Sequence, residues 1–286
     1  MIRIDAHHHV WRLHRGDYGW LTPELPIYRD YTLDDLRPLL GDVTATILVQ
    51  AAPTEAETAF LLQTARDSCG LVAGVVGWTD LAAPSAPDRI AELATDPRLV
   101  GLRPMLQDLA DPDWILRRDV LPALRAMVAA GLSFDALVRP RQLDAILTLL
   151  HRVPELRVVI DHAGKPDIRA GGFAFWAARI GRLAKQTGAF CKLSGLLTEA
   201  TPDWTPDDIR RYADHVIDCF GPERVMWGSD WPVLDLVSTY EAWRDLANGM
   251  VHASDRDRIF GGTAAVFYYL LPTCRADHRE FGSGAR

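Results

Sequence analysis

Eight short apolar runs, rich in Val, Ile and Leu, recur along the chain. Each run has the length of a β-strand. Runs that are hydrophobic almost throughout are typical of strands buried on both faces, as in a parallel sheet. The predicted strands cover residues 2–7, 44–50, 71–78, 99–104, 132–138, 157–162, 189–194 and 225–230.

The segments between these runs carry apolar residues at the spacing of amphipathic helices. One segment opens with Thr54, and Glu57 follows three residues later, which is the spacing of a capping box. Pro206 after Thr205 marks another helix start, because proline is favoured in the first helical turn. The predicted helices cover residues 54–68, 113–130, 140–152, 174–187 and 206–220.

The repeated alternation of strand and helix predicts an α/β fold. Eight such units in 286 residues favour a closed (β/α)8 TIM barrel, built as one domain, over an open doubly wound sheet. No GxGxxG motif follows the first strand, so the best marker of the open alternative is missing. We expect the barrel to span residues 1–272, with an insertion at 10–31, a closing helix after residue 259, and a partly disordered tail at 273–286.

Charge and cysteine content narrow the class of protein. The net charge is −7 and no cluster of Lys and Arg is present, which argues against nucleic acid as a partner. No apolar run approaches about 18 residues, so we expect no membrane span. The four cysteines, Cys69, Cys191, Cys219 and Cys274, form no CxxC pair. Together with the absence of a signal peptide, this favours reduced thiols in a cytoplasmic protein.

Polar residues gather at the predicted ends of the strands, where a TIM barrel places its active site. Asp5, His7 and His9 alternate along the first strand, so we expect them to share one face while His8 faces the other way. Two imidazoles at neighbouring inward positions can hold one divalent metal, or can donate hydrogen bonds to a carbonyl oxygen. We therefore interpret His7 and His9 as site residues and not as a chance cluster.

Two later strand ends add a histidine and a carboxylate. Asp161 and His162 end the sixth strand, and because they are adjacent we expect only His162 to face inward. Asp230 ends the eighth strand, which lies beside the first in a closed barrel. It could take a proton from water, or could merely cap the following segment. The predicted catalytic residues, which are also the predicted metal ligands, are His7, His9, His162 and Asp230.

Five further residues are predicted to bind the substrate. Arg103 ends the fourth strand and could hold a carboxylate or hydroxyl group, or could pair with an acid in the wall. Lys192 and Gln50 end two other strands. Trp20 and Trp231 are aromatic candidates for the pocket lining, although such residues also serve in plain packing.

These motifs resemble those of the sugar-lactonase branch of the amidohydrolase superfamily, which includes L-fuconolactonases and L-rhamnonolactonases. The likeness runs in order over about the whole chain. The HxH element alone marks only the superfamily, whereas GSDWPV together with CKLSG is much more specific. The matching segments cover residues 4–11, 17–21, 100–103, 161–166, 191–195, 220–222, 228–233 and 261–265.

The resemblance implies a barrel hydrolase that opens a sugar-acid lactone, with a 1,4 or 1,5 ring, by attack of water on the carbonyl. The small-molecule lactone is then the partner. The resemblance also places the four predicted catalytic residues at the reacting centre, with Arg103 and Lys192 in or near the pocket. Binuclear relatives add metal ligands at strands four and five, where this chain has Arg103 and Arg139. We therefore expect one divalent metal at most, with zinc favoured by the His ligands, and catalysis without metal stays open.

Other activities share this arrangement of residues. One alternative is hydrolysis of an unsaturated dicarboxylate lactone, for which Arg103, Arg139 and Lys192 could supply positive charges. A second is a metal-dependent, non-oxidative decarboxylase of the same superfamily. A third is a barrel that only binds its ligand, but a complete set of three histidines and one aspartate argues against it. The sequence leaves open whether the protein forms a homodimer.

Overall fold

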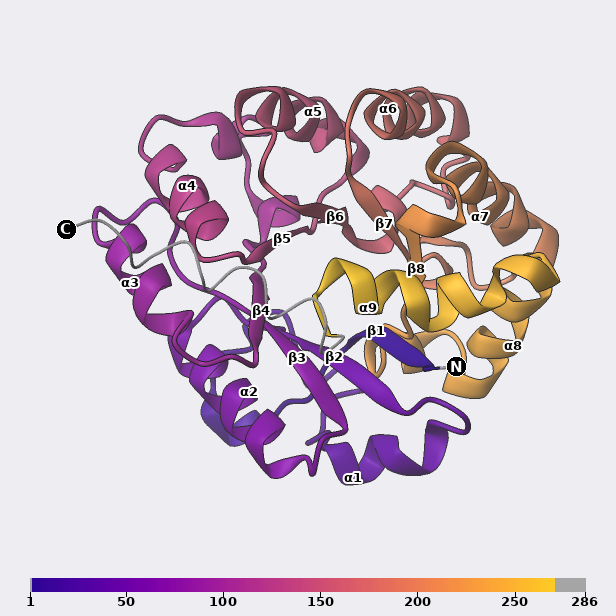
Figure 1. Ribbon diagram of the computed structural model, residues 1–286. Coiled ribbons are helices and arrows are strands. Elements are labelled where there is room, and N and C mark those ends of the chain that lie inside the picture. Colours follow the sequence, from indigo (N-terminus) through magenta and orange to yellow (C-terminus); the bar gives the residue numbers. More distant parts are fainter. Residues whose placement is uncertain (1, 271–286) are drawn as a thin grey trace.

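A computed structural model describes residues 2–270 of the chain. Its strands form one eight-stranded parallel sheet in which each strand pairs with the next along the sequence. Figure 1 shows the strands at the centre and the helices around them. The prediction of a single (β/α)8 barrel is confirmed. The strands are β1 (Ile4–His8), β2 (Ala45–Val49), β3 (Val72–Gly77), β4 (Leu99–Leu102), β5 (Ser133–Ala136), β6 (Val158–Ile160), β7 (Phe190–Leu193) and β8 (Val225–Trp227).

Helices lie in all five predicted segments, and three more, at residues 33–36, 86–93 and 240–250, were not predicted. One predicted segment differs clearly from the structure. The segment 113–130 was expected to be one helix, but its helix starts only at Leu121. Pro122 stands in the first turn, where a missing N–H breaks no helical hydrogen bond, and a short 3-10 turn at Trp114–Leu116 precedes it. The helices are α1 (Leu33–Leu36), α2 (Glu55–Asp67), α3 (Ala86–Leu93), α4 (Leu121–Ala129), α5 (Leu143–Arg152), α6 (Phe173–Gln186), α7 (Pro206–Phe220), α8 (Tyr240–Met250) and α9 (Thr263–Phe267).

The two predicted helix caps differ in detail. Thr205 caps α7 in a full capping box with Asp208. Thr54 accepts a hydrogen bond from the N–H of Glu57 at 3.1 Å, so its N-cap role is confirmed. The carboxylate of Glu57 does not return to Thr54. It accepts hydrogen bonds from the N–H groups of the loop residues 51–52 instead, so the reciprocal half of that capping box is wrong.

The barrel closes beyond the ends of β1 and β8. The N–H of His9 donates to the carbonyl oxygen of Trp231 at 2.7 Å, and the N–H of Asp230 donates to the carbonyl oxygen of His7 at 2.8 Å. These bonds place the segment after β8 directly beside the end of β1. The side chain of Asp230 is thereby brought to the histidines of β1.

Apolar side chains fill the amino-terminal half of the barrel interior. Ile4, Ile47 and Val159 come from different sides of the barrel, and all are fully buried in one cluster. Helix α9 belongs to the same cluster and lies across this end of the barrel (Figure 1). It is the closing helix expected after residue 259. The predicted domain end at 272 and the tail at 273–286 lie outside the described residues.

An irregularity in β1 changes which of its side chains face inward. Asp5 pairs with Thr46 of β2, and His8 pairs with Leu48. Three residue steps along β1 thus correspond to two steps along β2. Such an extra residue is a β-bulge, and it interrupts the alternation of faces. The bulge turns His7 inward even though Ala6 before it already lies in the interior cluster.

As a result, the prediction that Asp5 shares a face with His7 and His9 is wrong. The carboxylate of Asp5 accepts hydrogen bonds from the hydroxyl of Tyr240 on α8 at 3.2 Å and from the N–H of Ser229 at 2.9 Å. Asp5 therefore fastens α8 and the loop after β8 to the outside of β1. Burial raises the pKa of this carboxyl to about 6.

Candidate active site

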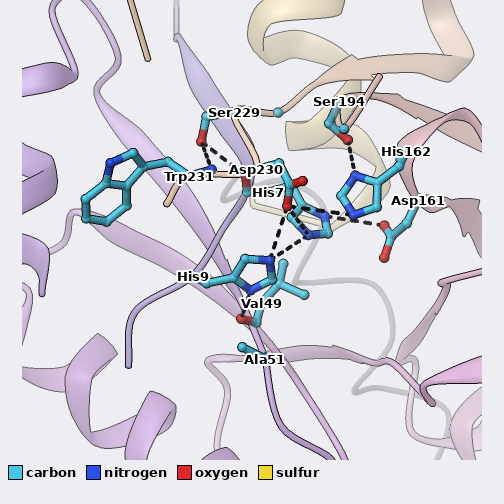
Figure 2. A network of polar contacts seen from close by, with 12 residues as sticks. His7, His9, Val49, Ala51, Asp161, His162, Ser194, Ser229, Asp230 and Trp231 are labelled. Carbon is cyan, nitrogen blue, oxygen red and sulfur yellow. Dashed lines mark hydrogen bonds and ion pairs between the residues drawn. The ribbon is translucent and has the colours of Figure 1, made fainter. Parts of the chain in front are cut away.

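Four polar side chains meet at the carboxyl end of the barrel, as Figure 2 shows. The Oδ1 atom of Asp230 lies 3.4 Å from Nε2 of His9 and 3.8 Å from Nε2 of both His7 and His162. At most 4% of the surface of each residue is exposed. The structure thus brings together the four residues predicted to be catalytic.

The outer nitrogens of two imidazoles are held by neighbouring strands. Nδ1 of His9 lies 2.7 Å from the carbonyl oxygen of Val49 at the end of β2. Because a carbonyl oxygen can only accept, this nitrogen carries a proton and donates it to the hydrogen bond, which leaves Nε2 facing Asp230. Nδ1 of His162 lies 2.9 Å from the hydroxyl oxygen of Ser194. These contacts orient both rings toward the same point.

The segment after β6 shows that a second prediction, that adjacent side chains point to opposite faces, is wrong. Asp161 was expected to face away from the site, but its Oδ1 lies 3.5 Å from Nδ1 of His7, and its side chain is fully buried. Strand β6 ends at Ile160, and His162 has a left-handed φ of 52°. Since the extended backbone has already ended, adjacent side chains need not point to opposite faces. Asp161 and His162 therefore both face inward.

A buried lysine lies beneath His7. Nζ of Lys192 is 2.6 Å from Oδ2 of Asp135, 3.0 Å from Oδ1 of Asp161 and 3.2 Å from Nδ1 of His7. The hydroxyl of Tyr268 also donates to Asp135 at 2.6 Å. Lys192 was predicted to bind the substrate, but it has no exposed surface and is not brought to the pocket wall. The structure favours a positioning role beneath His7.

Asp135 is a member of this network that sequence reasoning missed. It stands within β5, in a run that is otherwise apolar except for Ser133, and is fully buried. A carboxylate in such a run could have drawn attention, because a buried charge needs a partner. Its partner, Lys192, lies 57 residues further along the chain, and only the folded barrel brings the two together.

The protonation states at the centre follow from burial and neighbouring charge. Burial, with the nearby ammonium of Lys192, holds the pKa of His7 well below its ordinary value, and burial lowers the pKa of His162 to about 4. Both rings are therefore neutral at pH 7. Burial alone would raise the pKa of Asp230, but the facing histidines, His162 foremost, outweigh it and lower this pKa. Asp230 is thus ionised beside neutral imidazoles.

Arg103 faces the same centre and is held in place by Gln50. Its Nη1 lies 3.4 Å from Nε2 of His7 and 3.4 Å from Oδ2 of Asp161. Its Nη2 donates to the backbone carbonyl of Gln50, whose side-chain amide donates back to the carbonyl of Arg103 at 2.6 Å. Gln50 is fully buried, so it orients Arg103 and is not itself brought to the pocket surface.

A pocket of about 260 Å³ opens onto these groups. His9, Arg103, His162 and Asp230 line it, with Trp20 at its edge. The indole of Trp20 is fixed by a hydrogen bond of 2.8 Å to the carbonyl of Ala51. The volume suits a ligand of monosaccharide size.

The other predicted aromatic residue is not brought to the pocket. Trp231 is 1% exposed, and its ring packs edge-on against Tyr31 at 5.2 Å between centroids. Figure 2 shows its side chain pointing away from the histidines. Trp231 supports the loop that carries Asp230.

The donor set fits one divalent metal. Among the described residues, two groups could hold an ion: His7, His9 and Asp230, and His7, Asp161 and His162. The donor atoms of the first group are 3.2 to 3.8 Å apart. Ligands at about 2.1 Å from a tetrahedral zinc ion lie roughly 3.4 Å from one another. The imidazole nitrogens and the carboxylate are also ligand types that zinc accepts.

Comparison with known proteins agrees with this geometry. Residues 4–270 match the family described as Amidohydrolase. The chain is 46% identical to an L-fucono-1,5-lactonase of Burkholderia ambifaria and 38% identical to an L-fucono-1,5-lactonase of Burkholderia multivorans; each alignment covers 94% of this chain and 96% of the relative. The fold matches the crystal structure of a zinc-bound amidohydrolase from Burkholderia multivorans with a TM-score of 0.89 and 37% identity, over 95% of this chain and 100% of that one. The chain therefore belongs to the amidohydrolase family, in its sugar-lactonase branch.

Proposed function

We propose that this protein hydrolyses a sugar-acid lactone, of the L-fuconolactone type, to the open-chain aldonic acid. The observation that carries the proposal is the ionised Asp230 facing three imidazoles at the base of a pocket of monosaccharide size. The names of the two relatives, both L-fucono-1,5-lactonases, support a six-membered ring as the preferred substrate.

Asp230 is the general base in this proposal. A water molecule in the pocket donates a hydrogen bond to its carboxylate, which takes the proton as the water oxygen attacks the lactone carbonyl carbon. The bond between the carbonyl carbon and the ring oxygen then breaks. The protonated Asp230 returns the proton to the departing ring oxygen, so the reaction adds one water molecule in total.

Arg103 and the imidazoles stabilise the carbonyl oxygen of the lactone. Charge develops on that oxygen as water adds, and donors fixed before the reaction stabilise it most effectively. Nη1 of Arg103 is such a donor, because Gln50 and Asp161 hold the guanidinium in place. Lys192 lies too deep to touch the substrate and instead fixes His7 from below.

A divalent metal, zinc in our proposal, would be held by His7, His9, His162 and Asp230. When bound, it would polarise the carbonyl group and acidify water. The protein should then carry about one equivalent of zinc by elemental analysis, and prolonged chelation should remove both metal and activity. Full activity in metal-free protein would contradict the zinc proposal while leaving Arg103 as the polarising group.

The two other enzymatic alternatives are not favoured. The relatives are lactonases of a sugar acid, and the three cations proposed for a dicarboxylate do not converge. Arg103 lines the active-site pocket and Lys192 is fully buried. Arg139 lines a second hollow of about 730 Å³, which adjoins the pocket at Lys165. A substrate with two carboxylates would thus meet only one of them in the pocket.

The cellular compartment and the metabolic role of the protein are also part of the proposal. We infer a cytoplasmic enzyme of sugar breakdown. Cys69, Cys191 and Cys219 are free thiols, whereas Cys274 lies outside the described residues. None of the described helices is long and apolar enough to cross a bilayer. Size-exclusion chromatography would test the homodimer that the sequence leaves open.

A pH-indicator assay over a panel of lactones tests the function. The panel should contain 1,4- and 1,5-lactones of L- and D-sugar acids and one unsaturated dicarboxylate lactone. We expect acid release from a few L-sugar lactones and none from the dicarboxylate. Acid release from the dicarboxylate alone, or release of carbon dioxide from an aromatic acid, would overturn the proposal.

A further inference from the structure

Backbone strain is concentrated beside the catalytic residues. Within residues 2–270, six residues other than glycine have a left-handed φ, and four of them lie in or next to the active site. Such conformations are unfavourable and persist at functional sites, where the surroundings enforce them. The six residues are Cys69, His162, Ala163, Lys165, Asp230 and Tyr269.

Lys165 is the member of this set to which no role has yet been given. It ends the left-handed segment after β6 with a φ of 47°. A glycine would adopt this conformation without a Cβ clash. The chain has a lysine here instead, which draws attention to what its side chain contacts.

The side chain of Lys165 reaches the active-site pocket. It lines that pocket together with His162 and Asp230, and it also lines the adjoining hollow, where Glu199 stands. Nζ lies 2.9 Å from Oε1 of Glu199, and the two side chains are 17% and 16% exposed. Lys165 is therefore close enough to the reacting centre to contact a bound lactone.

The choice of lysine is itself unusual in this chain. Of the 31 Lys and Arg residues, only Lys165, Lys185 and Lys192 are lysines. Two of these three belong to the site, and Lys185 is exposed on α6. Lysine differs from arginine in offering a compact ammonium with three donors that can rotate. One donor serves Glu199, and the others can reach a ligand.

We propose that Lys165 and Glu199 form the part of the pocket that recognises the ring hydroxyls of the substrate. This inference rests on the proposed lactonase function and specifies how that site selects its substrate. The ammonium donates to one hydroxyl and the carboxylate accepts from its neighbour. A donor and an acceptor held side by side match two adjacent hydroxyls, each of which can donate and accept. Arg103 and the histidines remain free to serve the carbonyl.

The test compares two substrates in three variants. Lys165→Gly, Lys165→Met and Glu199→Gln are assayed on the best sugar lactone of the panel and on δ-valerolactone, whose ring lacks hydroxyls. Loss of a charged hydrogen bond in a pocket should lower kcat/KM for the sugar lactone by about 10- to 100-fold. On δ-valerolactone the loss should stay within about 3-fold, since the lost contact never existed there. Lys185→Met is the matched control and should behave as the wild type.

Thermal unfolding separates this role from a structural one. Lys165→Gly removes an ion pair but relieves the left-handed backbone, so its Tm should stay within about 3 °C of the wild type. Unchanged activity on the sugar lactone would overturn the inference. An equal loss on both substrates, or a large fall in Tm, would also overturn it. A wild-type protein inactive on every lactone would instead defeat the proposed function, before any variant is compared.

Discussion

The two halves of the barrel interior are equally buried but opposite in chemistry. In the amino-terminal half, Ile4, Ile47 and Val159 pack against α9 without a polar partner. In the carboxyl-terminal half, the strands and the residues that follow them carry buried charges, Lys192 and Asp161 among them. Apolar burial stabilises a fold, whereas a buried charge is tolerated only with partners. The comparison indicates that one half supplies stability and the other chemistry.

The polar half is arranged so that each charge has a counterpart. Lys192 contacts Asp135 and Asp161, and Arg103 also contacts Asp161. Tyr268, which follows α9 in the apolar half, donates to Asp135. The closing segment of the barrel is thus coupled to the network that supports His7.

The largest expected effect is on the polar half, where Asp230→Asn removes the general base. We expect kcat on the best lactone to fall by about 1,000-fold or more, because the amide cannot take the proton. Circular dichroism and Tm should stay near those of the wild type. Turnover within 10-fold of the wild type would contradict the role given to Asp230.

Breaking the buried ion network should cost stability as well as activity. Lys192→Met leaves Asp135 without its cation, and we expect unfolding in urea to show a loss of about 3–5 kcal/mol. Adding Asp135→Asn should recover part of that loss, because the unpaired charge is then removed. If Lys192→Met alone loses less than about 1 kcal/mol, the network does not stabilise the fold as described.

Glu57 is a buried carboxyl that lies outside the barrel interior, and its ionisation should affect stability alone. Burial raises the pKa of Glu57 to about 7. Its folded state therefore holds the proton more tightly than the unfolded state, and this contribution to stability is lost as pH rises from about 4.5 to 7. Relative to Glu57→Gln, the wild type should lose about 3 kcal/mol over that range in urea unfolding. A pH-independent difference between the two proteins would contradict the shift.

The smallest effect is expected in the apolar half. Ile47→Val removes one buried methyl group, and the free energy of unfolding should fall by about 1 kcal/mol. Because Ile47 belongs to the apolar cluster and not to the polar network, kcat and KM should not change. A change in KM or kcat of more than about 2-fold would mean that the two halves are not separable.

Much of the fold could be predicted from the sequence because its signal is local. Each strand is buried on both faces and therefore reads as an apolar run, as at 44–50 and 225–230. The strand ends also led to the prediction that His7, His9 and Asp230 lie together, since polar residues that follow an apolar strand stand at the active-site end of a barrel.

What escaped prediction depends on the fold as a whole. The bulge in β1 is one extra residue with no local signature, yet it turns His7 inward and so places it on a different face from Asp5. The inward position of Asp161 follows from left-handed backbone after β6. Likewise, the depth of Lys192 and the burial of Trp231 are set by neighbouring strands and loops, which a strand-by-strand reading does not contain.

The most direct test of water attack on the lactone carbonyl at this site is hydrolysis in water enriched in ¹⁸O, followed by mass spectrometry of the aldonic acid. We predict one ¹⁸O atom in the carboxylate and none in the hydroxyl released from the ring, at a rate that Asp230→Asn lowers by about 1,000-fold or more. Label in that hydroxyl, or labelled product formed equally fast by Asp230→Asn, would contradict attack of water on the carbonyl carbon at this site.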